Sequence, residues 1–359
     1  MESVNNQILI NYICKRIGKL DDKYVSVLEG YIEDNHLYMV DIDTWFFVDY
    51  NLDFDQLSVI ADIGTEMKGK LCWVKKILHV ENEFFFIIRN SKKIISYNPE
   101  KGINIYGEEY PIGIDEEVRY ADACVLNDRI YMLPIKSDGC ISIFNLKTRK
   151  YEDDIDISQI LNCRMTESRG ISRYIHNDKD DVVWFCLVGT DNVFKLDLRS
   201  LKAEHVMLDS YGAYEYVLGD EQNILGKTKD EYVIEYYYEK LFLALPPQMD
   251  KLNMIYPEGN NKVEVMLPSS SKLIYKLRFY DAKFSKGIIK AGRLFLLPFS
   301  SNGIVEVNLE TMKSVFHPSS ISSLDLWSKR VRNDNGIITE NEDAGLGAYL
   351  YAIGEPYQS

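Results

Sequence analysis

An aromatic residue and a later Asn or Asp recur together along this chain at an almost constant distance. The aromatic residue lies in a short apolar segment, and the Asn or Asp is usually followed by Leu. The pairs are Tyr38 with Asn51, Phe85 with Asn98, Tyr131 with Asn145, Trp184 with Asp197, and Phe295 with Asn308, at offsets of 13, 13, 14, 13 and 13 residues. A fixed offset over most of a chain indicates a single structural unit that is repeated.

The spacing of the aromatic residues indicates a sixth copy. Successive aromatic residues lie 47, 46, 53 and 111 residues apart, so the last step is about twice the others. Residues 240–246 read like residues 293–298 and supply Phe242, which divides the long step into 58 and 53 residues. The second half of this copy, near residues 252–255, matches poorly. We therefore count six units between about residues 22 and 317.

Repeats of forty to fifty residues that consist of short strands are typical of a β-propeller. The aromatic segments are apolar at consecutive positions, as in residues 84–88, which is typical of strands buried on both faces. We predict an all-β chain that forms one propeller domain over residues 1–359, with six four-stranded blades within residues 22–317. Two stacked β-sandwich domains are the alternative, but they have no reason to keep a constant offset.

A ring of blades needs a latch, because an unpaired first or last blade leaves strand edges open. We expect the terminal segments to close the ring, with one terminus adding a strand to the blade of the other. Residues 318–359 would form this C-terminal latch or a short helix. A seventh blade built from the two chain ends is left open, and residues 208–231 are expected to form a loop on one rim.

The charge of the chain limits its partners. It carries 41 Lys and Arg residues against 55 Asp and Glu residues, a net charge of −14 at pH 7. Nucleic acids and anionic membranes are bound by basic surfaces, so we expect neither as a partner. The sequence shows no signal segment and no Cys-x-x-Cys pair among its six cysteines. We predict a cytoplasmic protein with reduced cysteines, with a disulfide between Cys124 and Cys140 as the alternative.

Motifs that would indicate catalysis are absent from the sequence. The five histidines show neither the His-x-x-x-His nor the His-x-His spacing of a metal site. No glycine-rich phosphate loop and no Gly-x-Ser-x-Gly motif occurs. Asp154 and Asp156 alternate like the start of a calcium loop, but Gln159 and Met165 stand where such a loop needs Gly and Glu. We expect no cofactor and no metal, and an enzyme is the less favoured class.

The innermost strand of each predicted blade would line a central channel, where a ligand could bind. These strands carry Arg119, Tyr120, Asp122, Arg169, Arg173, Tyr174, Tyr280, Asp281, Lys283 and Lys286. Arginine and tyrosine gathered around one axis can bind an anionic or sugar-like ligand. We predict a ligand site, with Arg173 as its main contact, made of Arg119, Arg169, Arg173, Tyr174 and Tyr280. The alternative is that these strands are polar because water fills the channel.

The repeat is similar to kelch-like and related β-propeller repeats over about residues 22–317. The matching text is the apolar segment with its aromatic residue and the later segment that runs into Asn-Leu, as in residues 303–311. The Gly-Gly pair of kelch repeats and the Trp-Asp ending of another propeller family are both absent. The resemblance therefore implies a fold and transfers no catalytic residue.

The fold leaves the function open, because propellers support many unrelated activities. The favoured hypothesis is a non-enzymatic binding module that presents a protein or carbohydrate (glycan) partner on one rim or at the channel mouth. One alternative is a small-molecule enzyme, such as a lyase, a lactonase or a glycan-active enzyme, with its site in the channel. The other is a structural subunit of an assembly. The oligomeric state is also left open.

Overall fold

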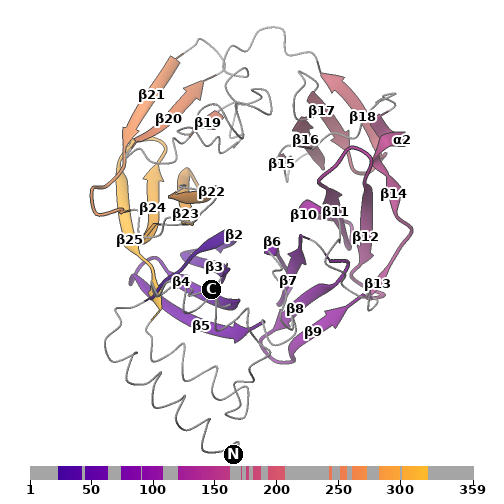
Figure 1. Cartoon of the computed structure of the whole chain (residues 1–359), viewed down its shortest axis with the longest axis horizontal. Coiled ribbons are helices and arrows are strands. Elements are labelled where there is room, and N and C mark those ends of the chain that lie inside the picture. Colours follow the sequence, from indigo (N-terminus) through magenta and orange to yellow (C-terminus); the bar gives the residue numbers. More distant parts are fainter. Residues whose placement is uncertain are drawn as a thin grey trace, which may run out of the picture.

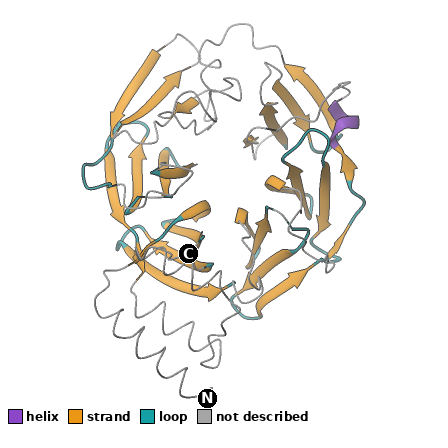
Figure 2. Ribbon diagram, viewed as in Figure 1, coloured by secondary structure: helices purple, strands orange, loops and turns teal. Residues whose placement is uncertain are grey.

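The chain folds into antiparallel sheets that stand around a common centre, each with one strand nearest to that centre (Figure 1). The computed structural model describes residues 23–42, 45–63, 74–89, 91–107, 120–161, 171, 175–177, 181–186, 193–206, 242–244, 251–256, 261–272, 283–299 and 301–321. Among these residues Figure 2 shows strands, loops and a single short helix, α2 (Ile157–Leu161). The fold is an all-β propeller, as the repeat predicts.

Five sheets contain four strands in simple up-and-down order, one of them with a fifth strand attached, and we call these sheets blades. The first blade contains β2 (Val27–Glu33), β3 (His36–Asp41), β4 (Phe46–Asn51) and β5 (Gln56–Asp62). The second contains β6 (Val74–Val80), β7 (Glu83–Ile88), β8 (Ile94–Asn98) and β9 (Gly102–Tyr106). The third contains β10 (Tyr120–Leu126), β11 (Arg129–Pro134), β12 (Cys140–Asn145) and β13 (Lys150–Tyr151), and β14 (Ile155–Asp156) also pairs with β12.

The remaining sheets complete the arrangement in chain order. The fourth blade contains β15 (Ile175–Asn177), β16 (Val182–Cys186), β17 (Val193–Asp197) and β18 (Lys202–Val206). A three-stranded sheet follows, with β19 (Phe242–Ala244), β20 (Lys251–Tyr256) and β21 (Asn261–Met266). The last blade contains β22 (Phe284–Lys290), β23 (Arg293–Pro298), β24 (Gly303–Asn308) and β25 (Ser314–Pro318).

The prediction of six or seven four-stranded blades is wrong, since the described residues form five. The copy around Phe242 yields the three-stranded sheet instead. In this sheet β19 carries the marker Phe242 and β20 and β21 follow it, so the strand missing from the described residues is the innermost one, which would precede β19. Residues 207–241, which precede β19, lie outside the described residues, and so does the predicted rim loop at 208–231.

The first and last described segments lie side by side. β1 (Lys23–Tyr24) pairs antiparallel with β26 (Ser320–Ile321), with Lys23 opposite Ile321. This pair forms a two-stranded sheet of its own, so the expectation that a terminus would extend a blade is not met in the described residues. Of the predicted C-terminal latch or helix, residues 318–359, the structure describes only residues 318–321, which end β25 and form β26. The rest lies outside the described residues, and complete closure of the ring stays a prediction.

The core consists of side chains packed between neighbouring sheets. Each of five hydrophobic clusters combines residues from two adjacent sheets, and one of them joins the first blade to the last. Phe47 and Phe86, for example, meet between the first and second blades with ring centroids 4.9 Å apart. Every residue of β7 is buried, as expected for a strand that is covered on both faces.

The recurring residues have the positions that the sequence predicts. In the four-stranded blades, the aromatic markers lie on β3, β7, β11, β16 and β23, each next to the innermost strand. Phe85 and Phe295 are buried and Tyr38 is half-buried, while the side chains of Trp184 and Phe242 are outside the description. The Asn or Asp at the end of each third strand accepts a hydrogen bond from the backbone N–H two residues on. The donors are the N–H groups of Asp53, Glu100, Lys147, Arg199 and Glu310. These turns confirm the predicted role of the Asx residue.

Candidate functional site

Four innermost strands share an irregularity at the same place. In β2, β6, β10 and β22 the pairing with the next strand shifts by a bulge near the start of the strand. The bulges follow buried apolar residues, and two positions after each of these residues the chain carries a charged side chain. The four charged residues are Glu29, Lys76, Asp122 and Lys286. A bulge bends a strand and redirects a side chain, so the repeat places ionisable groups at equivalent points near the centre.

These four residues, which we call the axial quartet, form two ion pairs between blades. Lys286 binds Glu29, which connects the last blade to the first. The Lys76 Nζ lies 3.2 Å from Asp122 Oδ1 and connects the second blade to the third. Their side chains are only 5% exposed for Glu29, 11% for Asp122, 18% for Lys286 and 23% for Lys76, so the lysines keep the greater access to solvent.

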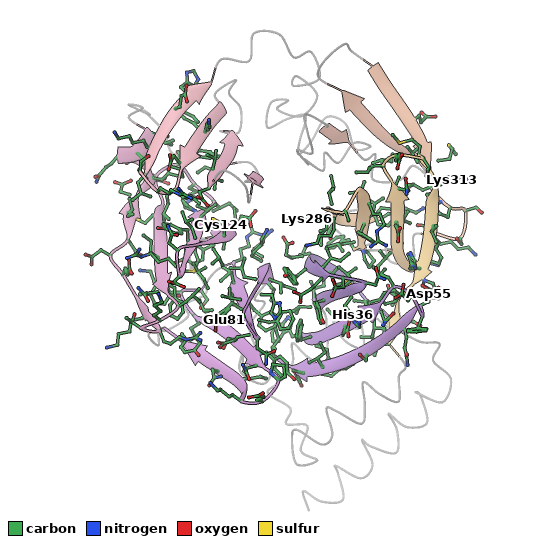
Figure 3. The ribbon with its side chains drawn as sticks, turned by 180° about the vertical axis from the view of Figure 1, so that it is seen from behind. His36, Asp55, Glu81, Cys124, Lys286 and Lys313 are labelled. Carbon is green, nitrogen blue, oxygen red and sulfur yellow. The ribbon has the colours of Figure 1, made fainter. Side chains whose placement is uncertain are left out.

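The charges of the axial quartet alternate around the centre. β22, β2, β6 and β10 follow one another as neighbours, which gives the order positive, negative, positive, negative. Lys286 lies at the edge of its sheet that faces the centre, as seen from behind in Figure 3. The quartet therefore has no net charge but presents both donors and acceptors.

Burial and neighbouring charges change the protonation of two members. Burial alone would raise the pKa of Asp122, but the ammonium groups of Lys76 and Lys286 and the N–H of Ala123 outweigh it and lower this pKa. Burial lowers the pKa of Lys286, and Lys76 lowers it further, while Glu29 and Asp122 act in the opposite direction. Asp122 is thus held as a carboxylate, whereas the amine of Lys286 loses its proton more easily than an exposed lysine.

The predicted ligand site is not tested by the structure. Arg119, Arg169, Arg173, Tyr174 and Tyr280 all lie outside the described residues.

Four other residues named from the innermost strands are described. Tyr120 is buried, and its hydroxyl donates a hydrogen bond to Ser142 Oγ at 2.8 Å. Asp122 and Lys286 belong to the axial quartet. The side chain of Lys283 is buried and donates a hydrogen bond to the carbonyl oxygen of Ser271 at 2.7 Å.

Sequence reasoning missed Glu29 and Lys76, although a signal for them exists. Each member of the quartet stands nine residues before an aromatic marker of the repeat. The positions are 38 − 9 = 29, 85 − 9 = 76, 131 − 9 = 122 and 295 − 9 = 286. This offset is fixed by the hairpin that joins the innermost strand to the next, so a search at constant distance from the markers would have found all four.

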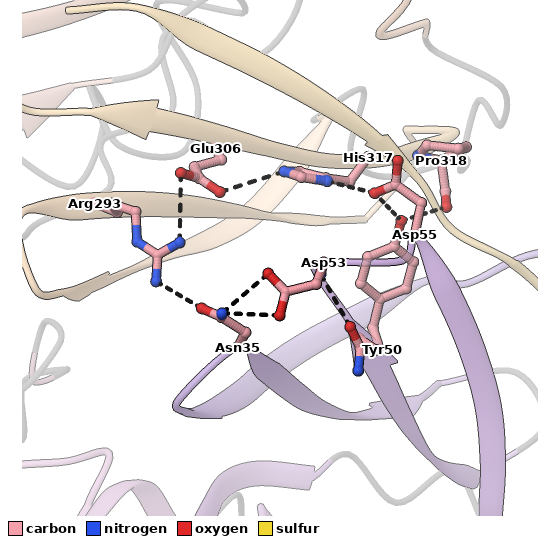
Figure 4. Close-up of polar contacts among 9 residues, drawn as sticks. Asn35, Tyr50, Asp53, Asp55, Arg293, Glu306, His317 and Pro318 are labelled. Carbon is pink, nitrogen blue, oxygen red and sulfur yellow. Dashed lines mark hydrogen bonds and ion pairs between the residues drawn. The ribbon is translucent and has the colours of Figure 1, made fainter. Parts of the chain in front are cut away.

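A second polar cluster lies where the first blade meets the last (Figure 4). We call it the seam cluster, and its members are Asn35, Tyr50, Asp53, Asp55, Arg293, Glu306 and His317. The His317 Nδ1 lies 2.6 Å from Asp55 Oδ1, and its Nε2 lies 3.3 Å from Glu306 Oε2.

Further contacts of the seam cluster extend from these carboxylates. Tyr50 donates hydrogen bonds to Asp55 at 3.2 Å and to the carbonyl oxygen of Pro318 at 2.9 Å. Arg293 reaches Glu306 at 3.7 Å and donates to Asn35 at 3.1 Å. Burial lowers the pKa of His317, but the carboxylates of Glu306 and Asp55 outweigh burial and raise it above the ordinary value.

The described residues contain no group of three or more His, Cys, Asp and Glu side chains that could hold a metal ion. In the same part of the chain, no helix has the length and apolar character needed to cross a membrane. Cys124 is buried and Cys140 is exposed, and both are free thiols, which contradicts the alternative of a disulfide between them. The cytoplasmic location and the expected partners stay predictions.

Comparison with known proteins supports no family assignment. No family model matches the chain, and no curated protein matches it. Among solved structures, virginiamycin B lyase from Staphylococcus aureus is similar with 12% identity and a TM-score of 0.46, over 85% of this chain and 90% of that one. YCF48 from Cyanidioschyzon merolae has 10% identity and a TM-score of 0.46, over 85% and 88% of the two chains. The designed protein Ika8 has 9% identity and a TM-score of 0.46, over 84% and 91%. At these values the similarity concerns the chain architecture alone.

Proposed function

We propose that this protein is a non-enzymatic binding module whose partner binds at the centre of the propeller, against the axial quartet. The observation that carries the proposal is the recurrence of a charged side chain at the same bulged position of four innermost strands. The partner would be either a carbohydrate or a polar segment of a protein, which are the two classes of partner proposed from the sequence.

Stability does not by itself account for these charges. Burying an ion pair removes water from both groups, and apolar residues of similar size usually give equal or greater stability. The neighbouring positions on the same strands are apolar and buried, as at Val74, Ile77, Tyr120 and Ala123. The scaffold therefore accepts apolar side chains next to the quartet, and a role in recognition explains why the quartet positions are charged.

The alternating charges also indicate what kind of partner fits. A cluster without net charge does not attract ions of one sign over a distance, so it gains little from a purely anionic ligand. It offers ammonium donors and carboxylate acceptors side by side, which suit the hydroxyl groups of a sugar or the peptide groups and termini of a polypeptide.

Binding can be measured by thermal shift and by calorimetry with neutral oligosaccharides, dipeptides and free amino acids. We expect at least one class to bind the wild-type protein. The double variant Lys76→Gln with Asp122→Asn should lose this binding, because it removes one ion pair while keeping the size of both side chains.

A matched control is the exposed ion pair between Lys147 and Asp128, whose side chains are 76% and 54% exposed. The variant Lys147→Gln with Asp128→Asn should bind like the wild type. If the quartet variant folds and also binds like the wild type, the partner does not use the quartet and the proposal is wrong.

A small-molecule enzyme at the same place is the second candidate. Burial lowers the pKa of Lys286, which favours this candidate, because a lysine that loses its proton more easily than an exposed one is a better nucleophile.

A further inference from the structure

Lys286 stands in surroundings that make a lysine amine reactive. It lies on β22 at the face toward the centre, and its side chain is only 18% exposed. The other lysine of the axial quartet, Lys76, lies on β6, on the far side of β2 from Lys286, and its positive charge lowers the pKa of Lys286. Desolvation and a neighbouring cation are the two conditions under which a lysine becomes a nucleophile toward carbonyl compounds.

The quartet also contains the groups needed to move protons. Glu29 is bonded directly to Lys286 and can accept the proton that the ammonium group must lose. Asp122 is held as a carboxylate and balances the charge of Lys76 at 3.2 Å. Lys283 differs from Lys286, because its side chain is 5% exposed and its Nζ donates a hydrogen bond to the carbonyl oxygen of Ser271 at 2.7 Å.

We propose that Lys286 forms an imine with the aldehyde or ketone group of a small ligand held at the axial quartet. This inference rests on the proposed binding function and names the chemistry of the ligand.

The step is balanced without an oxidant or a reductant. Lys286 passes a proton to Glu29, and the free amine attacks the carbonyl carbon, so that a C–N bond forms and the carbonyl π electrons move to oxygen. That oxygen takes one proton from the nitrogen and one from Glu29, and it leaves as water as the C=N bond forms. The net reaction converts an ammonium group and a carbonyl group into a protonated imine and water.

The proposal predicts selective labelling of Lys286 in the wild-type protein. Folded protein is treated at pH 7 with a low concentration of glycolaldehyde and cyanoborohydride, which reduces any imine to a stable amine, and the labelled lysines are identified by peptide mass spectrometry. Lys286 should be labelled several-fold faster than Lys147, although Lys147 is 76% exposed. Lys283 should be labelled much more slowly than either. Labelling of Lys286 no faster than that of Lys147 would overturn the proposal.

Variants of the quartet test the cause of the reactivity. Lys76→Met should slow the labelling of Lys286 several-fold, and Lys76→Arg should restore it, because arginine returns the positive charge. Equal labelling in all three proteins would show that Lys76 does not activate the amine. The variant Lys286→Arg keeps a cation beside Glu29 but cannot form an imine. It should therefore take up no label at position 286, although the positive charge at this position is unchanged.

The two proposals can fail separately. Lys286 could fail to be labelled selectively while the Lys76→Gln, Asp122→Asn variant loses the ligand binding measured by calorimetry. In that case the proposed imine formation is wrong and the proposed binding function stands. If Lys286 is labelled selectively but that variant binds every ligand class like the wild type, the imine stands and the proposed binding function is wrong.

Discussion

Replacing His317 with Gln should remove a pH-dependent part of the stability of the protein. His317 lies in the seam cluster between two carboxylates, and its side chain is 9% exposed. Glutamine is neutral at every pH and can still form hydrogen bonds, so the variant isolates the contribution of the imidazolium charge.

The direction of the effect follows from the pKa of His317. The carboxylates raise this pKa in the folded state above its ordinary value of about 6.5. A group of this kind binds its proton more tightly in the folded state, so its stabilisation is fully present below about pH 6.5 and is lost as the pH rises through the folded pKa. The wild type should therefore exceed the variant in stability at pH 5.5, and the difference should shrink toward pH 9.

The magnitude is modest because one of the two carboxylates is exposed and the other is only partly buried. Asp55 is 49% exposed, so its pair with His317 contributes about 0.5 kcal/mol after screening by solvent. Glu306 is 16% exposed and lies 3.3 Å away, without the geometry of a full hydrogen bond, so about 1 kcal/mol is reasonable, below the usual range for hydrogen bonds to charged groups. The sum is about 1–2 kcal/mol at pH 5.5.

The free energy of unfolding should be measured by urea titration of both proteins at pH 5.5 and pH 9. His36→Gln is a suitable control, because His36 lies 2.9 Å from Asp49 within the first blade but is 39% exposed. The control should lose less than about 0.5 kcal/mol at either pH. If His317→Gln lowers the free energy of unfolding equally at both pH values, or more at pH 9, the imidazolium charge does not stabilise the contact between the first and last blades.

Three further predictions concern the core, the turns and the thiols. Phe295→Ala should lower the free energy of unfolding by about 3–5 kcal/mol, because the Phe295 ring is fully buried; a loss below about 1 kcal/mol in urea titration would indicate an exposed ring. Gly303→Ala should lower the thermal stability more than Gly102→Ala does. A methyl group at Gly303 would overlap the backbone of β25, whereas Gly102 has open space and only the strain of its φ of +77°; equal losses in calorimetry would refute the overlap. Cys140 should react with a thiol reagent in the folded protein and Cys124 only after unfolding, and equal reaction rates would contradict the burial of Cys124.

The strands, the turns and the class of fold could be predicted from the amino-acid sequence alone, because they depend on short-range order along the chain. The aromatic markers predict the second strand of each blade, because consecutive apolar residues need cover on both faces. Asn51 and its equivalents predict turns because an Asx side chain bonds the backbone only two residues away. The copy around Phe242 was also visible in the sequence, and its described residues form three strands, of which β20 covers the poorly matching residues 252–255.

Which charged residues pair with one another could be learned only from the tertiary structure. Lys286 and Glu29 are 257 positions apart in the chain and pair only because the last blade stands beside the first. His317 and Asp55 are 262 positions apart and meet at the same seam. Nothing in the local sequence of β2 or β22 states which strand will be its neighbour. The direction of each side chain is fixed by a bulge in pairing with another strand, and that pairing exists only once the sheets have assembled around their common centre.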